Sequence, residues 1–408
     1  MRLLKIYTDS FKGLSAESWM LAVVMLINRS GSMVLPFLGI YMTDHLGFSL
    51  KNAGLVLSFF GIGSVLGSWL GGMITDKIGE FKVQSAALLL SVPLFCMIPL
   101  FKSEVGLAII ILLQSTVSEA FRPANSVAIT RYAKKGNITR SFSLNRMAVN
   151  LGFSIGPALG GILSAISYNF LFFSNALAAL IAGITYIWFF RNRSHRNREI
   201  VKETTSNPKS LSPYRDQKFI LFAFFCLLFS VCFFQILNTL TIFYKEEAKL
   251  SQRTIGYILG YSGLIIVILE MLFVQIAERK FKLRFTLFLG TFLCGISFAI
   301  LGFNNSLVIL IISMTILCVG EIWTLPFMST VTALRSGADN KGAYMGLLGI
   351  GFSLAFIITP SLGTFIAQEF GFSTLWIGTG ILMTIAAIGF YYIIPWMLGD
   401  KQNESDME

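Results

Sequence analysis

Six charged side chains lie inside long apolar stretches of this 408-residue chain. They are three arginines and three glutamates, namely Arg29, Glu119, Arg122, Arg146, Glu270 and Glu321. A charge near the centre of a bilayer costs roughly 2.5–3.5 kcal/mol, so charges kept there indicate a path for ions or substrate. A carboxyl group held between an apolar environment and a nearby arginine can take up and release a proton. We therefore predict proton coupling by the glutamates, with Glu119 as the leading acceptor, Glu321 as the alternative and Glu270 in a smaller role; sodium coupling stays open.

The stretches that hold these charges are long enough to cross a membrane. Hydrophobic residues make up 55% of the chain and charged residues only 13%, whereas soluble domains carry about 25% charged residues. A membrane-spanning helix needs about 20 apolar residues. Twelve such stretches are expected, at 17–42, 52–75, 82–101, 105–131, 141–166, 169–190, 218–244, 253–276, 283–303, 306–331, 341–367 and 372–397. The sequence predicts an all-α membrane protein.

The basic residues indicate how the chain is oriented. Most of the 32 Lys and Arg residues fall in the segments on one side of the twelve expected spans. The positive-inside rule places that side, with both termini, in the cytoplasm. The net charge of +11 is therefore a sign of topology in a lipid bilayer, not of nucleic-acid binding. We expect a monomer in the plasma or inner membrane.

The chain divides into two halves. The polar segment 191–217 is expected to be a cytoplasmic linker between a six-helix bundle at 1–190 and a second bundle at 218–408, which ends in a short cytoplasmic tail. Residues of the same type recur at an offset of 203 positions, as with Pro123 and Pro326. Such a repeat predicts two pseudo-symmetric six-helix bundles, the parallel duplication found in many transporters.

The loop after the second expected span reads GGMITDKIGEFK and contains Gly72, Asp76, Lys77 and Gly79. These four residues resemble the signature of the major facilitator superfamily in the same loop. The resemblance implies a gate at the cytoplasmic ends of spans 2 and 3. The sequence departs from the family pattern at Glu80, where a basic residue is usual.

A glycine-rich pattern, NLGFSIGPALGG, lies in the fifth expected span. Its residues are Gly152, Gly156, Pro157, Gly160 and Gly161. Glycines four residues apart allow helices to approach closely. The pattern resembles the antiporter motif of the twelve-helix drug:proton antiporters, the bacterial multidrug efflux branch. In that fold spans 1, 4, 7 and 10 line a central cavity, which implies that Arg29, Glu119, Arg122 and Glu321 face water there.

The expected cavity is largely apolar, with few polar residues. We expect it to be lined by Met33, Phe37, Asn125, Gln235, Asn238 and Trp323. Such a surface suits amphipathic or lipophilic small molecules. The predicted function is secondary active transport by alternating access, namely proton-coupled efflux. The alternative is proton-coupled uptake of peptides or another small metabolite, because IYMTDHLGFS resembles a segment of oligopeptide transporters, although the E-x-x-E-R signature of those proteins is absent.

The sequence offers no motif for catalysis. A G-x4-G-K-[ST] phosphate loop is absent, which argues against ATP as the energy source. The five cysteines lie in apolar stretches without C-x-x-C spacing, so we expect no metal and no cofactor. The chain is expected not to be an enzyme.

Overall fold

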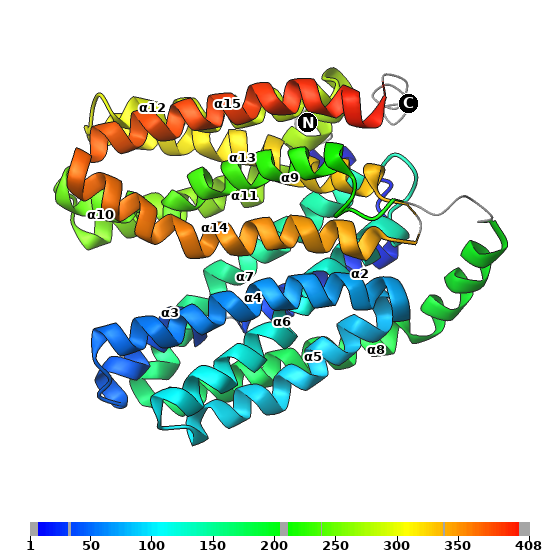
Figure 1. Ribbon diagram of the computed structural model, residues 1–408, viewed down its shortest axis with the longest axis horizontal. Helices are drawn as coiled ribbons and strands as arrows, with labels where there is room; N and C mark the ends of the chain where they lie inside the picture. Colours follow the sequence, from blue (N-terminus) through cyan, green and yellow to red (C-terminus); the bar gives the residue numbers. More distant parts are fainter. Residues whose placement is uncertain (1–6, 32–33, 205–210, 238, 338, 400–408) are drawn as a thin grey trace.

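The computed structural model describes residues 7–31, 34–204, 211–237, 239–337 and 339–399 (Figure 1). In this part of the chain the regular structure is helical, and ten helices are long and apolar enough to cross a membrane. They are α4 (Leu50–Ile78), α5 (Glu80–Met97), α6 (Glu104–Tyr132), α8 (Tyr168–Thr204), α9 (Gln217–Phe233), α11 (Gln252–Lys280), α12 (Leu283–Leu301), α13 (Leu307–Arg335), α14 (Lys341–Phe370) and α15 (Phe372–Leu398).

The first and seventh expected spans differ from the sequence prediction, because each is broken. The first consists of α2 (Ala16–Ser30), α3 (Val34–Ile40) and a π-helical turn, and Gly31 closes α2 by donating its N–H to carbonyls in the last turn. The seventh consists of α9, a 3₁₀ turn at Phe234–Leu237 and α10 (Thr239–Glu246). Phe234 lies 203 positions after Gly31, so the breaks follow the offset of the sequence repeat.

The helix at the fifth expected span, α7 (Ile138–Ile166), is 29 residues long. Its last 18 residues, 149–166, contain no charged side chain. Its first third, ITRSFSLNR, is polar and includes Arg140 and Arg146. The charged residues of α7 therefore all lie in its first third.

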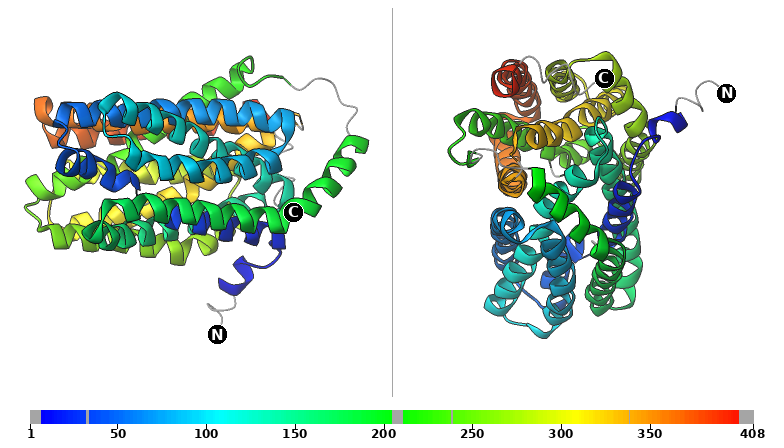
Figure 2. Two further views of the ribbon diagram at one scale, coloured as in Figure 1. Left: turned by 90° about the horizontal axis from the view of Figure 1, so that it is seen from below. Right: turned by 90° about the vertical axis from the view of Figure 1, so that its right-hand side faces the viewer.

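The helices lie in two layers, α2–α8 and α9–α15, as Figure 1 shows and the end-on view of Figure 2 confirms. One apolar core lies wholly between Phe219 and Met397, and another between Val34 and Ala176. Between the layers, α4 packs against α14 and α7 packs against α11. Large apolar side chains such as Trp188 (77% exposed) lie on the outside of the helices, as expected for surfaces that contact lipid.

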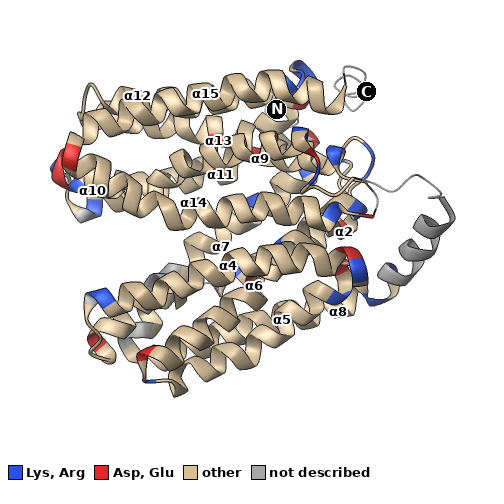
Figure 3. Cartoon of the chain, viewed as in Figure 1, with Lys and Arg blue, Asp and Glu red and all other residues tan. Residues whose placement is uncertain are grey.

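The two ends of the protein differ in charge. Lys and Arg gather where both termini lie (Figure 3), and we call this the basic end; the opposite end is the far end. Helix α8 continues beyond the basic end to Thr204, well into the segment 191–217 that was expected to be a linker. Residues 191–204 contain neither Gly nor Pro, so nothing in their sequence stops the helix. The expected tail at 400–408 lies outside the described residues.

Candidate functional site

Arg146 of α7 connects the two layers near their centre. Its Nε donates to the two carboxylate oxygens of Glu270 at 2.9 and 3.1 Å, and its Nη1 lies 3.1 Å from Oε1 of Glu321. The side chain of Glu270 on α11 is 0% exposed, and that of Glu321 on α13 is 9% exposed. We call these residues the Arg146 triad. One guanidinium faces two carboxylates, so the fully ionised triad carries one excess negative charge.

A second triad lies within the first layer. Nη1 of Arg122 is 3.1 Å from Oε2 of Glu119, one turn earlier on α6. Arg29 of α2 interacts electrostatically with both residues. Its Nε is buried without a hydrogen-bond partner in the described structure. This Arg29 triad has two guanidinium groups and one carboxylate, and therefore one excess positive charge. The side chain of Arg122 is 39% exposed and that of Glu119 is 10% exposed.

The sequence indicated that Arg146 lies inside a span but gave no partner for it. In the structure Arg146 binds Glu270 and Glu321 of the other layer. Glu270, given a smaller role, is the most deeply buried carboxylate of the triad. Its partner is 124 residues away in the chain, so local spacing could not reveal the pair.

Asp76 and Gly72 of α4 contact the beginning of α14 at the basic end. The two oxygens of Asp76 accept the N–H groups of Gly342 and Ala343 at 2.6 and 2.8 Å. These are among the first N–H groups of α14, which lack partners within the helix and attract negative charge. A Cβ atom on Gly72 would lie 2.4 Å from the carbonyl oxygen of Gly342, so the backbones meet directly.

The other members of this loop motif lie beside the contact. Lys77 is exposed, and Gly79 joins α4 to α5 with φ +91°, a conformation that favours glycine. Glu80, the departure from the family pattern, is fully buried and pairs with Arg131 at 2.5 Å. It therefore belongs to an ion pair within the first layer.

A second set of contacts closes the basic end between α7 and the second layer. Arg140 pairs with Glu278 of α11 at 3.0 Å, and Oγ1 of Thr330 on α13 hydrogen-bonds to Oγ1 of Thr139 at 3.1 Å. Nε2 of Gln275 donates to the carbonyl of Asp9 at 3.3 Å, so the N-terminal segment also reaches the second layer. The basic end is therefore closed on both sides of the protein.

The far end is different. A Cβ atom added to Gly54 of α4, or to Gly256 or Gly260 of α11, would meet no atom within 4 Å. On the same helix α4, Gly61 is already close to Ile357 of α14, and Gly72 touches the backbone of that helix. The close contacts of the α4 glycines with α14 therefore lie at the basic end and centre, and Gly54 near the far end has none.

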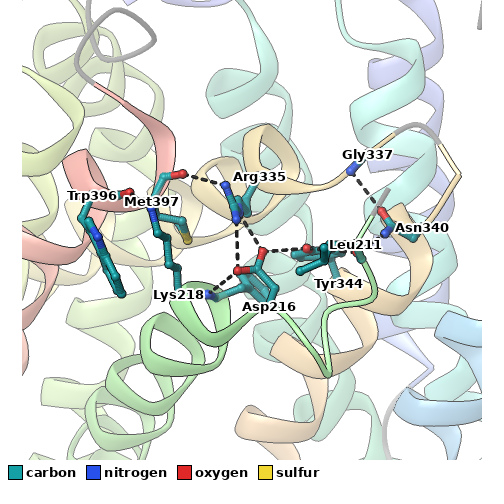
Figure 4. A network of polar contacts seen from close by, with 10 residues as sticks. Leu211, Asp216, Lys218, Arg335, Gly337, Asn340, Tyr344, Trp396 and Met397 are labelled. Atoms are coloured by element: carbon teal, nitrogen blue, oxygen red, sulfur yellow. Dashed lines mark hydrogen bonds and ion pairs between the residues drawn. The ribbon is translucent and has the colours of Figure 1, made fainter. Parts of the chain in front are cut away.

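Asp216, just before α9, is the centre of a polar network at the basic end (Figure 4). It accepts hydrogen bonds from Arg335 at 2.7 and 3.0 Å and from the hydroxyl of Tyr344 at 2.8 Å. Burial raises the pKa of the Asp216 carboxyl, but these hydrogen bonds outweigh burial and hold the pKa below its usual range. Asn340 and Tyr344 also donate to the carbonyl of Leu211. The network fixes the end of the linker beside the start of α14, where Asp76 binds; the sequence reasoning missed it.

The remaining predicted residues fall into two groups. In the glycine-rich motif, Gly152 packs on Arg29, and a Cβ there would lie 2.6 Å from the Cβ of Arg29. Gly156 and Gly160 are buried in α7, which packs against α11. The motif also includes Pro157 and Gly161, whose surroundings lie outside the described part of α7.

Among the expected cavity residues, Met33 and Asn238 lie outside the described residues. Phe37 is half-buried, and Gln235 is buried with its Oε1 unpaired in the described structure. Asn125 donates to Asn145 at 3.3 Å. Trp323 donates to the carbonyl of Phe273 at 3.0 Å and therefore packs within the second layer.

Comparison with known proteins places this architecture among transporters. The family model described as "Major Facilitator Superfamily" matches residues 20–289 and 245–405. The uncharacterized MFS-type transporter YttB of Bacillus subtilis is 24% identical over 95% of this chain and 96% of its own length. The multidrug resistance protein MdtH of Blochmanniella floridana is 23% identical over 88% of this chain and 90% of its own length.

A solved structure shares the fold. The crystal structure of a bacterial homologue of the iron transporter ferroportin, in its outward-facing state, has a TM-score of 0.74 at 17% identity. The match covers 92% of this chain and 99% of that protein.

Proposed function

We propose that this chain, which belongs to the major facilitator superfamily, exports amphipathic or lipophilic small molecules in exchange for protons. Proteins of this family are membrane transporters, and the chain is a transporter and not an enzyme. The single observation that carries the proposal is the Arg146 triad, in which one guanidinium joins two buried carboxylates across the two layers. The name of the relative MdtH supports efflux of drug-like molecules.

The proposed topology has twelve spans in two six-helix bundles, 1–190 and 218–408, joined by the segment 191–217. Among the described residues, two apolar cores are each confined to one layer and support this division, whereas a third contains residues of both layers. We propose that the protein lies in the inner membrane with its basic end in the cytoplasm, because Lys and Arg gather at that end. The structure is then the outward-facing state of an alternating-access cycle.

The proton is proposed to bind the Arg146 triad. When Glu270 and Glu321 are both ionised, Arg146 attracts both and holds the layers together at this depth. A proton taken up from outside neutralises one carboxylate and the excess charge of the triad, which weakens the bridge and favours opening of the basic end. Release of the proton to the cytoplasm restores the bridge while substrate moves outward. Each transport cycle thus moves one proton inward.

The test uses purified protein in liposomes with a trapped pH-sensitive dye and a panel of amphipathic compounds. Glu270→Gln and Glu321→Gln keep the side-chain shape but cannot carry the proton. We expect each to lower substrate-dependent proton entry by about tenfold or more, whereas substrate exchange without a pH gradient continues. Glu369→Gln, at an exposed position on α14, is the control and should behave as wild type. Wild-type proton entry in both triad variants would refute the mechanism.

A further inference from the structure

The Arg29 triad has unused capacity to donate hydrogen bonds. Among the described residues, Arg29 forms no hydrogen bond and no salt bridge, although its Nε is buried. Arg122 uses one nitrogen, Nη1, for Glu119, and the rest of its partly exposed guanidinium is available. A buried donor without a partner costs free energy. A ligand that supplies acceptor atoms and one negative charge would satisfy both the donors and the excess positive charge.

Aromatic rings lie beside both guanidinium groups. Cζ of Arg29 is 5.7 Å from the ring centroid of Phe153, which is 48% exposed. Cζ of Arg122 is 6.0 Å from the ring of Phe352, which belongs to α14 of the second layer. The cationic groups of the first layer are therefore bordered by apolar rings from α7 and α14, so the position lies between the layers.

Helix α7 adds another donor on the same face. Arg146, Asn150 and Phe153 follow each other at spacings of four and three residues, which places them on one side of the helix. Arg146 at one end of this row reaches the second layer, and Phe153 at the other end meets Arg29. Nδ2 of Asn150 is buried and has no partner in the described structure. The free groups on and beside this face are donors that suit an anion.

We propose that the Arg29 triad binds the anionic group of an amphipathic substrate, a carboxylate or sulfonate attached to an aromatic body. Arg29 and the free nitrogens of Arg122 hold the anion, and Phe153 and Phe352 contact the aromatic part. This inference rests on the proposed transport of amphipathic molecules and narrows their class. Glu119 competes with the ligand, because both are anions that bind Arg122.

The competition gives the test two opposite expectations. Arg29→Gln removes a donor group and one positive charge, and should weaken binding of an aromatic anion by about tenfold or more, the effect of losing one charge-assisted hydrogen bond. Glu119→Gln removes the competing carboxylate and raises the charge of the triad from one to two, so it should tighten binding. A purely structural role of these residues would not make any variant bind more tightly.

The ligands are naphthoate, naphthylmethanol and naphthylmethylammonium, which share the aromatic body and differ in charge. Equilibrium dialysis against the purified full-length protein measures their affinities. Wild type should prefer naphthoate to the other two by about tenfold or more. Arg253→Gln, at an exposed site near the start of α11, removes the same charge away from the triad and should keep this preference.

The outcomes distinguish the anion site from the proposed proton-coupled transport. Equal affinity of wild type for the three ligands, or unchanged naphthoate affinity in both Arg29→Gln and Glu119→Gln, would overturn the anion site. If either variant fails to fold, Arg29→Lys, which keeps the charge, should retain the naphthoate preference, and its loss there would count against the site. If naphthoate binds as expected but no compound drives proton entry, the proposed function fails and the anion site stands.

Discussion

A methyl group at position 72 tests whether the glycine contact between α4 and α14 controls the conformation. In Gly72→Ala the new Cβ would lie 2.4 Å from the carbonyl oxygen of Gly342 and 3.1 Å from the Cα of Gly346. Both neighbours are backbone atoms that cannot rotate away. Overpacking of this kind costs about 1–3 kcal/mol. The clash exists only while the basic end is closed. The ratio of molecules with an open basic end to those with a closed one should therefore rise by about 5- to 150-fold.

Gly54→Ala is the matched control, because it makes the same change on the same helix where no atom lies within 4 Å. Alanine also raises the intrinsic stability of a helix by about 1 kcal/mol over glycine. That gain applies to both variants and to both conformations. It therefore cancels when the two variants are compared.

The assay measures the distance between spin labels at Lys51 on α4 and Phe370 on α14, both exposed at the far end. Wild type and Gly54→Ala should give mainly the long distance of the open far end. Gly72→Ala should add a population at shorter distance, because the far end closes as the basic end opens. Identical distance distributions in the two alanine variants would show that the glycine contact does not hold the basic end closed.

Three further changes probe other contacts. Asp76→Asn loses the charge that binds the start of α14; transport in liposomes should fall severalfold while the melting temperature in detergent changes little, and full activity would contradict the gating role. Gly156→Leu places a large side chain where α7 packs on α11; the carrier should become inactive or leak protons, and normal coupled transport would refute the need for close packing. Asp216→Asn should destabilise the protein by about 1.5–3 kcal/mol at neutral pH. Because the folded-state pKa of the Asp216 carboxyl is lowered, the stability advantage of wild type over Asp216→Asn should be lost as the pH falls below about 4. Thermal unfolding measures this advantage, and a difference that does not depend on pH would contradict the charged pair with Arg335.

Hydropathy predicts most helices of this protein because their ends coincide with charged or polar loops. The stretch expected at 105–131 is α6 at Glu104–Tyr132, and the stretch expected at 306–331 is α13 at Leu307–Arg335. The break at Phe234–Leu237 could not be predicted in this way. The surrounding residues contain neither Gly nor Pro, so no helix-breaking residue marks the interruption.

In the candidate site, too, contacts within one helix could be predicted from the sequence, and contacts between helices could not. The Glu119–Arg122 pair follows from positions one helical turn apart on a single helix. The partners of Arg146 depend instead on how α7, α11 and α13 are rotated about their axes, which is decided by packing between layers. The sequence shows that Glu270 and Glu321 are unusual, but it does not show that they share one guanidinium.

The six central charges also limit how this site can change during evolution. One triad carries an excess positive charge and the other an excess negative charge, so the six charges sum to zero. Loss of any single charge leaves the interior unbalanced, at a cost on the scale of roughly 2.5–3.5 kcal/mol. Homologous sequences should therefore replace these residues in compensating pairs of opposite sign. Arg146, on which two carboxylates depend, should be the last of the six to vary.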